Sequence, residues 1–555
     1  MRKKNVWRRV GALALIVAMT MSAFTACSSK KTGTSDPGVT KDNAAVESTD
    51  GSGNTAAGGE DYSTKLTFTV LSLDYPDGFD DFPLVKEAKE KFNVDFQVQL
   101  VAWDNWDETV RTLAATSSLP EVLAWYNLNY GEYLQYAEQG VLKALPDDLS
   151  PWPELQKVAG AMPVFENLRV DGHMYAFPKI NNNQPVNEYK NQGIIYRRDW
   201  AKAMGYNFEP VQELTYDEFV AYLKDLKAKD PGGLGDKLVP MDYYSGGLTW
   251  ADAASQFNKY YSSYYVKDGK YVWGGRDKAT LDGILALKDL YDAGLLYKDS
   301  YADTTSAGTE RFGAGRSGVW YGDLSLTGLV DMVDNLKLAD SDIEDEDIGS
   351  FILKMPDGKI HWSQKDNWWA SFAFSSSCSD EIMNRWLAIG NWLMEEEQVE
   401  KYAYGIPEED WTKDENGNVT VKWSAQDIAE GGSKSYISQQ RFFQKFFMLE
   451  GADKWLEGNP AKRTYLQDEV FLPYYERLGK LGDEGNVILY PVNYDVSFFS
   501  GTYKNQYGDF SSDVQSAVIQ AVVSSDPEGT WNNFLSTNAS NIDAVLQELD
   551  KNLLQ

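Results

Sequence analysis

Aromatic side chains stand out among the residues of this sequence that could bind a ligand. The chain contains 18 Trp, 33 Tyr and 24 Phe, which together make up 14% of its residues. An aromatic ring beside a polar group suits a sugar, because the ring covers the apolar C–H face while carboxylates and amides bind the hydroxyl rim. Trp125-Tyr126-Asn127 and Trp320-Tyr321-Gly322-Asp323 combine both features. For any single aromatic residue, packing in the core is the alternative interpretation.

The elements that would position these residues alternate between strands and helices. The pattern predicts strands at 66–73, 94–101 and 121–126, and helices at 84–92, 109–117 and 130–139. Such repetition predicts a mostly parallel sheet with helices on both faces, and ligands of such sheets meet the loops at the carboxyl ends of the strands. Further on we expect a capping box at Thr215 and Glu218, a strand at 317–321 and helices at 279–293, 381–404 and 542–554.

Patterns for metal binding and catalysis are weak by comparison. His173 and His361 are the only histidines, which leaves little material for a histidine metal site. The segment 414–418 has part of a calcium-loop pattern, but Ala425 stands where an EF-hand needs its bidentate Glu, so we expect a β-hairpin turn. No nucleophile elbow, phosphate-binding loop or zinc motif is present in the sequence. We therefore expect no catalytic residues, no metal ligands and no cofactor.

The N-terminal segment predicts export and lipid attachment. Residues 1–9 carry five positive charges and precede an apolar run at 10–26, which is the pattern of a secretory signal peptide. The run ends in Phe24-Thr25-Ala26-Cys27, which resembles a bacterial lipobox, so we expect lipidation of Cys27; a plain cleaved signal is the alternative. Residues 27–62 are rich in Ser, Thr, Gly and Asp and should form a flexible tether. The expected location is the extracellular face of the cell membrane.

Charge and cysteine content narrow the possible partners. The 555 residues include 83 acidic and 52 basic ones, for a net charge of −31. This charge argues against binding to nucleic acid and against an electrostatic grip on anionic lipid, so membrane contact should occur through the lipid anchor only. Two cysteines cannot form a disulfide framework, and Cys378 is expected to be a buried free thiol.

Several segments, taken in order, resemble one known family. They lie at 113–122, 136–145, 170–178, 196–205, 312–323 and 404–411. Behind a lipobox and a tether, this series resembles the extracellular solute-binding proteins of the family 1 type, the lipoprotein receptors of carbohydrate ABC importers. The resemblance covers most of the mature chain.

The resemblance implies an α/β, two-lobed, periplasmic-binding-protein-like fold with several crossings between the lobes. The implied divisions are a signal peptide at 1–26, a tether at 27–62, a first lobe at 63–178 and 324–375, and a second lobe at 179–323 and 376–555. Candidate ligand-binding residues lie where strands should end or where the lobes should be joined. They are Asp74, Tyr75, Trp103, Trp125, Asn127, Trp250, Trp320, Asp323, Trp368 and Trp369. Because neighbouring residues of a strand face opposite ways, at most one of Trp368 and Trp369 should face the cleft.

The implied function is that of a monomeric receptor that delivers a carbohydrate, most consistent with a neutral oligosaccharide, to the permease subunits of an ABC importer. Two alternatives remain open. One is a peptide receptor of the same fold, although the aromatic-rich loops favour sugar. The other is a surface-anchored glycoside hydrolase that uses two carboxylates.

Overall fold

The structure is a computed structural model. It describes residues 62–73, 75–126, 130–161, 164–180, 189–244, 256–299, 301, 303, 306–365, 368–417, 419–424, 427, 433–447, 465–493, 496, 499, 501–507 and 511–553, some of them by their backbone only. Within these parts of the chain, no helix has the length and apolar character needed to cross a membrane.

The first sheet has the strand order β2-β1-β3-β14-β4, and β5 also pairs with β14. Its strands are β1 (Leu66–Ser72), β2 (Val94–Leu100), β3 (Val122–Tyr126), β4 (Leu142–Lys143), β5 (Ala176–Ile180) and β14 (Trp368–Ser375). β1 runs parallel to β2 and β3, which confirms the predicted alternation of strands and helices. β14 comes from far downstream and is antiparallel to β3, β4 and β5, so the sheet is mixed where a mostly parallel one was predicted.

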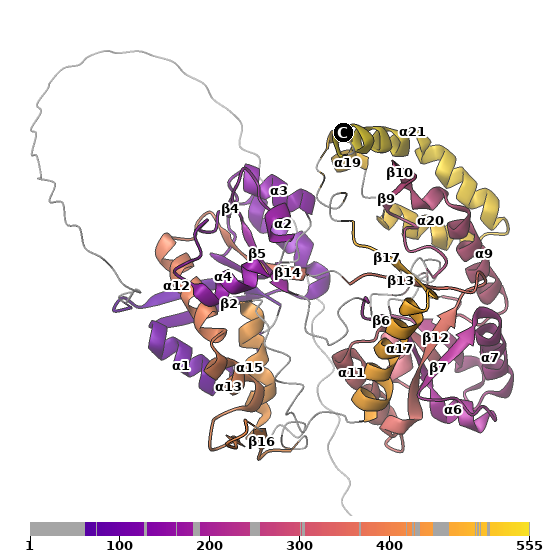
Figure 1. The fold of residues 1–555 in the computed structure, drawn as a ribbon, viewed down its shortest axis with the longest axis horizontal. Helices are drawn as coiled ribbons and strands as arrows, with labels where there is room; N and C mark the ends of the chain where they lie inside the picture. The colour runs from indigo at the N-terminus through magenta and orange to yellow at the C-terminus, as the bar shows by residue number, and fades with distance from the viewer. Residues whose placement is uncertain are drawn as a thin grey trace, which may run out of the picture. The chain divides into compact units, whose positions relative to one another are not determined.

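Helices pack beside this sheet around one hydrophobic core (Figure 1). They are α1 (Pro83–Phe92), α2 (Trp106–Ala115), α3 (Tyr130–Glu138), α4 (Pro153–Gly160), α5 (Val164–Asn167), α12 (Asp380–Leu393), α13 (Glu396–Tyr404) and α15 (Ser435–Phe446). Trp386 of α12 is fully buried, with its ring stacked 4.1 Å from that of Phe447. Cys378 is a buried free thiol, as predicted, and burial raises its pKa to about 12. A short hairpin of β15 (Trp411–Lys413) and β16 (Val419–Val421) follows α13.

The second sheet has the order β7-β12-β6-β11-β8. Its strands are β6 (Gln192–Arg197), β7 (Val211–Thr215), β8 (Val239–Tyr243), β11 (Ser317–Asp323) and β12 (Ile348–Lys354). β11 is parallel to β8 and β12 is parallel to β7, whereas β6 lies between them and is antiparallel to both. Neighbouring residues of β6 separate into different cores, with Ile194 and Tyr196 in one and Ile195 in the other. This separation is the period-two alternation of a strand that is covered on both faces.

The remaining elements complete this second lobe. Its helices are α6 (Arg198–Ala203), α7 (Tyr216–Lys229), α9 (Lys278–Asp292), α10 (Ala307–Gly313), α11 (Leu326–Ala339), α17 (Leu472–Asp483), α19 (Thr502–Tyr507), α20 (Ser511–Val523) and α21 (Pro527–Leu553). Two small sheets pair β9 (Tyr264–Lys267) with β10 (Lys270–Trp273), and β13 (Ile360–Ser363) with β17 (Val487–Tyr490). Figure 1 shows α21 beside α20 and α9, which it contacts. The predicted capping box is present: Glu218 N donates to Thr215 Oγ1 over 3.3 Å, and Thr215 N donates to Glu218 Oε2 over 2.8 Å.

Short turns of tighter or wider helix connect these elements. The 3₁₀ turns are Phe79–Asp81, Trp103–Asn105, Gly235–Lys237, Gly274–Arg276 and Asp345–Asp347, and a π-helical turn, Leu466–Phe471, precedes α17.

The lobe boundaries differ from those expected for 324–375 and 376–555. β12 lies in the second sheet, because its backbone bonds to β6 and β7, so 326–363 belongs to the second lobe. In contrast, α12, α13 and α15 pack into the first core. The chain therefore passes between the two sheets three times: after β5, after β13 and after α15.

Candidate functional site

A cavity of ≈ 990 Å³ is the candidate site, and residues of both lobes line it. From the first lobe come residues of α3, and from the second come the loop before β9, the ends of β13 and β17, and α19. The described lining residues are Tyr130, Gly131, Glu132, Leu134, Gln135, Glu138, Lys190, Lys259, Tyr260, Ser262, Ser263, Tyr264, Ser363, Gln364, Tyr490, Pro491, Val492, Asn493, Val496, Phe499 and Lys504.

The parallel pair β13 and β17 builds the wall of the cavity in the second lobe. Both strands end there, with Ser363 opposite Tyr490 in register. Beyond the pair, Gln364 N donates to Tyr490 O over 2.8 Å, and Val492 N donates to Gln364 Oε1 over 3.2 Å. Lys190 N donates to Ser363 O over 3.0 Å. The carboxyl ends of the two strands thus fix the loops that carry polar side chains into the cavity.

Three tyrosine rings form an aromatic corner at this wall. The ring of Tyr260 stacks on that of Tyr265, with centroids 4.4 Å apart and planes at 16°. The ring of Tyr490 lies 4.9 Å from Tyr260 at 74°. The Tyr260 hydroxyl donates to Pro491 O over 3.3 Å, and the Tyr265 hydroxyl donates to Asp277 Oδ2 over 2.7 Å. Tyr260 and Tyr490 therefore offer two nearly perpendicular rings, beside backbone and side-chain polar groups, to a ligand in the cavity.

His361 holds Tyr490 in place from behind the wall. Its Nε2 lies 2.9 Å from Asp357 Oδ2, and its Nδ1 lies 2.8 Å from the Tyr490 hydroxyl. Burial raises the pKa of Asp357, but hydrogen bonds from Lys359 and His361 outweigh it and hold the pKa below its usual value. Since an ionised carboxylate only accepts, Nε2 of the imidazole carries a proton and donates a hydrogen bond to Asp357. Burial, with the charge of Asp357, raises the pKa of Tyr490 to about 12, so it stays a neutral phenol.

The sequence-predicted site residues that the structure describes lie elsewhere. Trp103 follows β2 and is 49% exposed. Tyr75 follows β1 and donates to Asp80 Oδ1 over 2.5 Å, while its ring stacks on that of Phe446. Neither residue lies among the described lining residues of the cavity.

Trp320 and Asp323 have structural roles in β11. Trp320 is 2% exposed and belongs to the core of the second lobe, so its ring packs against protein in this conformation. Asp323 accepts hydrogen bonds from Ser325 N over 2.9 Å and Ser325 Oγ over 3.0 Å, just before α11. Its side chain is exposed, although surrounding protein atoms raise the pKa of the carboxyl against the hydrogen bonds from Ser325 and the charge of Lys365.

The other predicted residues cannot be placed at the level of side chains. Asp74, Asn127, Trp250 and Cys27 lie outside the described residues. For the remaining three, Trp125 in β3 and Trp368 and Trp369 in β14, the description is limited to the backbone.

Sequence reasoning missed the cavity because its wall is built from short segments without periodicity. The usable signal is compositional: Lys259-Tyr260-Tyr261-Ser262-Ser263-Tyr264-Tyr265 interleaves aromatic and polar residues, and Tyr490-Pro491-Val492-Asn493 does so more weakly. No pattern in either segment predicts that the two segments lie together in the fold.

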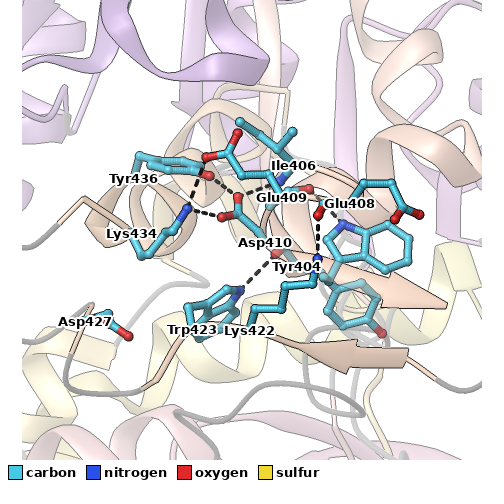
Figure 2. Close-up of polar contacts among 12 residues, drawn as sticks. Tyr404, Ile406, Glu408, Glu409, Asp410, Lys422, Trp423, Asp427, Lys434 and Tyr436 are labelled. Atoms are coloured by element: carbon cyan, nitrogen blue, oxygen red, sulfur yellow. Dashed lines mark hydrogen bonds and ion pairs between the residues drawn. The ribbon is translucent and has the colours of Figure 1, made fainter.

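A second polar cluster, around Asp410, serves the fold rather than a ligand (Figure 2). Asp410 is 0% exposed, and its carboxylate accepts from Ile406 N over 2.7 Å as well as from Lys434 and Tyr436. Gly405, at φ +91°, leaves no room for a Cβ beside this carboxylate. The cluster thus ties the β15–β16 hairpin to the start of α15. The hairpin itself confirms the turn predicted around 414–418, where Gly417 N donates to Asp414 O over 3.0 Å.

No group of three or more His, Cys, Asp and Glu side chains is arranged to hold a metal ion among the residues described.

Comparisons with known proteins bear on this site. A family model for bacterial extracellular solute-binding protein matches residues 79–353. The polygalacturonan/rhamnogalacturonan-binding protein YtcQ of Bacillus subtilis (strain 168) is 23% identical over 404 residues, covering 69% of this chain and 73% of that protein. Lipoprotein LipO of the same organism is 24% identical over 272 residues, covering 48% of this chain and 51% of that protein.

The solved structure of the alginate-binding protein AlgQ2 without calcium ion has the same fold. It superposes with a TM-score of 0.63 at 16% sequence identity, covering 88% of this chain and 97% of that chain. This likeness establishes the two-lobed architecture.

Proposed function

We propose that this chain, which belongs to the bacterial extracellular solute-binding proteins, is the receptor of an ABC importer and binds an oligosaccharide in the ≈ 990 Å³ cavity. The observation that carries the proposal is the corner of Tyr260 and Tyr490, whose rings lie at 74° and are surrounded by hydroxyl, amide and charged side chains. Rings of this kind suit the C–H faces of sugars, and the polar groups suit their hydroxyls. The volume lies near the upper end of what single small-molecule sites usually offer, which favours several sugar units over one.

The aromatic-rich sequence favours a neutral oligosaccharide, whereas two similar proteins bear names that point to acidic polysaccharides. YtcQ is named for binding polygalacturonan and rhamnogalacturonan, and AlgQ2 for binding alginate. The charge of the sugar therefore depends on the groups that line the cavity.

We also propose that Cys27 carries a lipid and that residues 27–62 tether a monomeric body to the outer face of the membrane. The lipobox-like end of the signal peptide supports this, as does the name of the relative LipO. Labelling of the expressed chain with a palmitate analogue, compared with the Cys27→Ala variant, tests it. Label on both variants would contradict the proposal.

The cavity does not have to account for every ligand contact. Trp103 follows β2 and Asp323 is the last residue of β11. Both side chains are exposed, and they remain proposed contacts for a longer ligand. Asp74, Tyr75, Trp125, Asn127, Trp250, Trp320, Trp368 and Trp369 remain proposals of the sequence analysis.

A thermal unfolding screen against oligosaccharides and short peptides tests the function. A ligand at 100 times its dissociation constant stabilises the folded state by about 2.7 kcal/mol, which raises the melting temperature measurably. We expect stabilisation by an oligosaccharide and no cleavage of that oligosaccharide on prolonged incubation. Stabilisation by peptides alone, or turnover of the sugar, would contradict the proposed function.

A further inference from the structure

The charges that line the cavity are divided between its two sides. The second lobe contributes Lys190, Lys259 and Lys504, and among the described lining residues it contributes no Asp or Glu. Helix α3 of the first lobe contributes Glu138 and Glu132, of which Glu132 pairs with Arg111, and it contributes no Lys or Arg. Three lysines on one wall are notable in a chain with 83 acidic and 52 basic residues. The cavity thus has a basic side and an acidic side.

Lys190 is held at the basic side by its backbone. Its N–H donates to Ser363 O over 3.0 Å, and its carbonyl accepts from Gln192 N over 2.8 Å and from Trp362 Nε1 over 3.0 Å. Among the described residues its ammonium group has no hydrogen-bonding or ion-pair partner. A fixed backbone therefore presents a charged group whose hydrogen bonds are left for solvent or ligand.

Lys259 is positioned by the indole ring of Trp362. Its Nζ lies 5.8 Å from the ring centroid of Trp362, within the range of a cation–π contact. Trp362 is buried, so it cannot move freely between positions. One buried side chain thus contacts the backbone of Lys190 and the ammonium group of Lys259, which places both residues at this side of the cavity.

We propose that the cavity selects an acidic oligosaccharide, one that contains uronic acid, and binds its carboxylate at the basic side. This inference rests on the proposed function, since it names the sugar class that the same cavity takes. An ammonium–carboxylate hydrogen bond is stronger than one between neutral groups, so the lysines favour a carboxylate over a hydroxyl. Glu138 repels a carboxylate but accepts hydrogen bonds from hydroxyls, so it favours one direction of the ligand, whereas the charge of Glu132 is already paired with Arg111.

Calorimetric titration of the full chain with matched sugars tests the inference. The probes are the trimers of galacturonate, mannuronate and glucuronate, the methyl ester of each, and neutral trisaccharides. We expect one acid to bind at least tenfold more tightly than its own ester, and we expect its affinity to fall as NaCl increases, because salt screens the charges.

Variants locate the effect. Lys190→Met should weaken binding of the acid roughly tenfold while changing binding of the ester less than about twofold, because an ammonium group bonds more strongly to a carboxylate than to a neutral ester. Glu138→Gln should strengthen binding of the acid. The control is Lys267→Met, which removes one positive charge from an exposed position of β9 outside the described cavity lining. It should change neither the affinity for the acid nor the affinity for the ester.

Each outcome separates the two proposals. Equal binding of acid and ester, or binding of neutral sugars alone, overturns the inference and leaves the proposed function standing. Binding of no sugar at all overturns both. An acid that binds equally well to wild type and Lys190→Met overturns the placement of its carboxylate.

Discussion

Tyr490 shows why individual contacts of the site escape prediction from sequence. Its hydroxyl bonds to His361, which lies 129 residues earlier, and its ring meets Tyr260 at 74°. The sequence identifies Tyr490 as one of 33 tyrosines, and packing in the core is the ordinary fate of an aromatic residue. Trp320 is the reverse case: it had a favourable neighbourhood in the sequence, yet it lies in the core at 2% exposure. The kind of side chain that binds a sugar could be predicted from residue types. Which of the many aromatic residues lines the cavity depends on tertiary contacts.

Removing the ring of Tyr260 tests the aromatic corner. We expect Tyr260→Ala to weaken sugar binding about tenfold, since it deletes one sugar-facing ring and exposes the flank of Tyr490. Tyr260→Phe keeps the ring and loses the hydrogen bond to Pro491, so it should retain most of the affinity. Calorimetric titration of both variants measures the difference. Equal affinities for the two variants would place the sugar elsewhere.

Asp410 offers a prediction about stability instead of binding. Asp410→Asn leaves Lys434 without its buried counter-charge, and breaking such a pair should lower the unfolding free energy by about 3 kcal/mol. The neighbouring Glu409→Gln is the control, because Glu409 is exposed and pairs with Lys434 only at 3.4 Å (Figure 2). Urea unfolding measures both variants. Sugar affinity should be unchanged in each, and a loss of affinity in Asp410→Asn alone would give this cluster a role in the site.

At the scale of elements, the hydrophobic periodicity of each segment predicted the helices and strands that form through local interactions. β1, α1, β2, α2, β3 and α3 follow the expected alternation, because each has the periodicity of its own type of element. The pairings of β14 with β3, and of β13 with β17, could not be predicted in this way. They join segments far apart in the sequence, and no turn between them fixes their register.

Glu213 joins three elements of the second lobe and yields a prediction about pH. Its carboxylate pairs with Arg477 Nε of α17 over 2.5 Å and with Lys354 Nζ of β12 over 2.7 Å. Burial raises the pKa of Glu213, but these hydrogen bonds outweigh it and hold the pKa below its usual value of 4.5. The ion pairs therefore add stability above that value, and this stability is lost as the pH falls through the lowered pKa.

We expect Glu213→Gln to lower the unfolding free energy at pH 7 by about 1 kcal/mol or less, since all three side chains are partly exposed. The difference from wild type should shrink as the pH is lowered below 4.5. Urea unfolding at several pH values measures it, with the exposed Glu90→Gln as the control. A difference that stays constant with pH would contradict the ionic origin.

At the scale of the whole molecule, the resemblance supplied the two lobes and the structure corrected their boundaries. Each lobe takes chain from both halves of the sequence, because the chain passes between the two sheets three times. The passage after β5 lay close to the expected one, since a change of pattern marks it. The other two follow from strand pairing and core packing: β12 pairs with β6 and β7, and α12 packs into the first core.

This arrangement explains why the cavity could not be predicted from the sequence. Its lining comes from α3 near residue 130, from the segments around 190 and 260, and from 363–364 and 490–504. The described lining residues thus come from five stretches of chain, and each stretch alone has the pattern of a surface segment or of one face of an ordinary helix.

The most direct test of the account is a crystal structure of the chain with its bound oligosaccharide. We expect a sugar ring within about 4 Å of Tyr260 or Tyr490, with its polar groups reaching Lys190 and α3. A sugar seated against Trp103 or Asp323, with the Tyr260–Tyr490 corner empty, would contradict it.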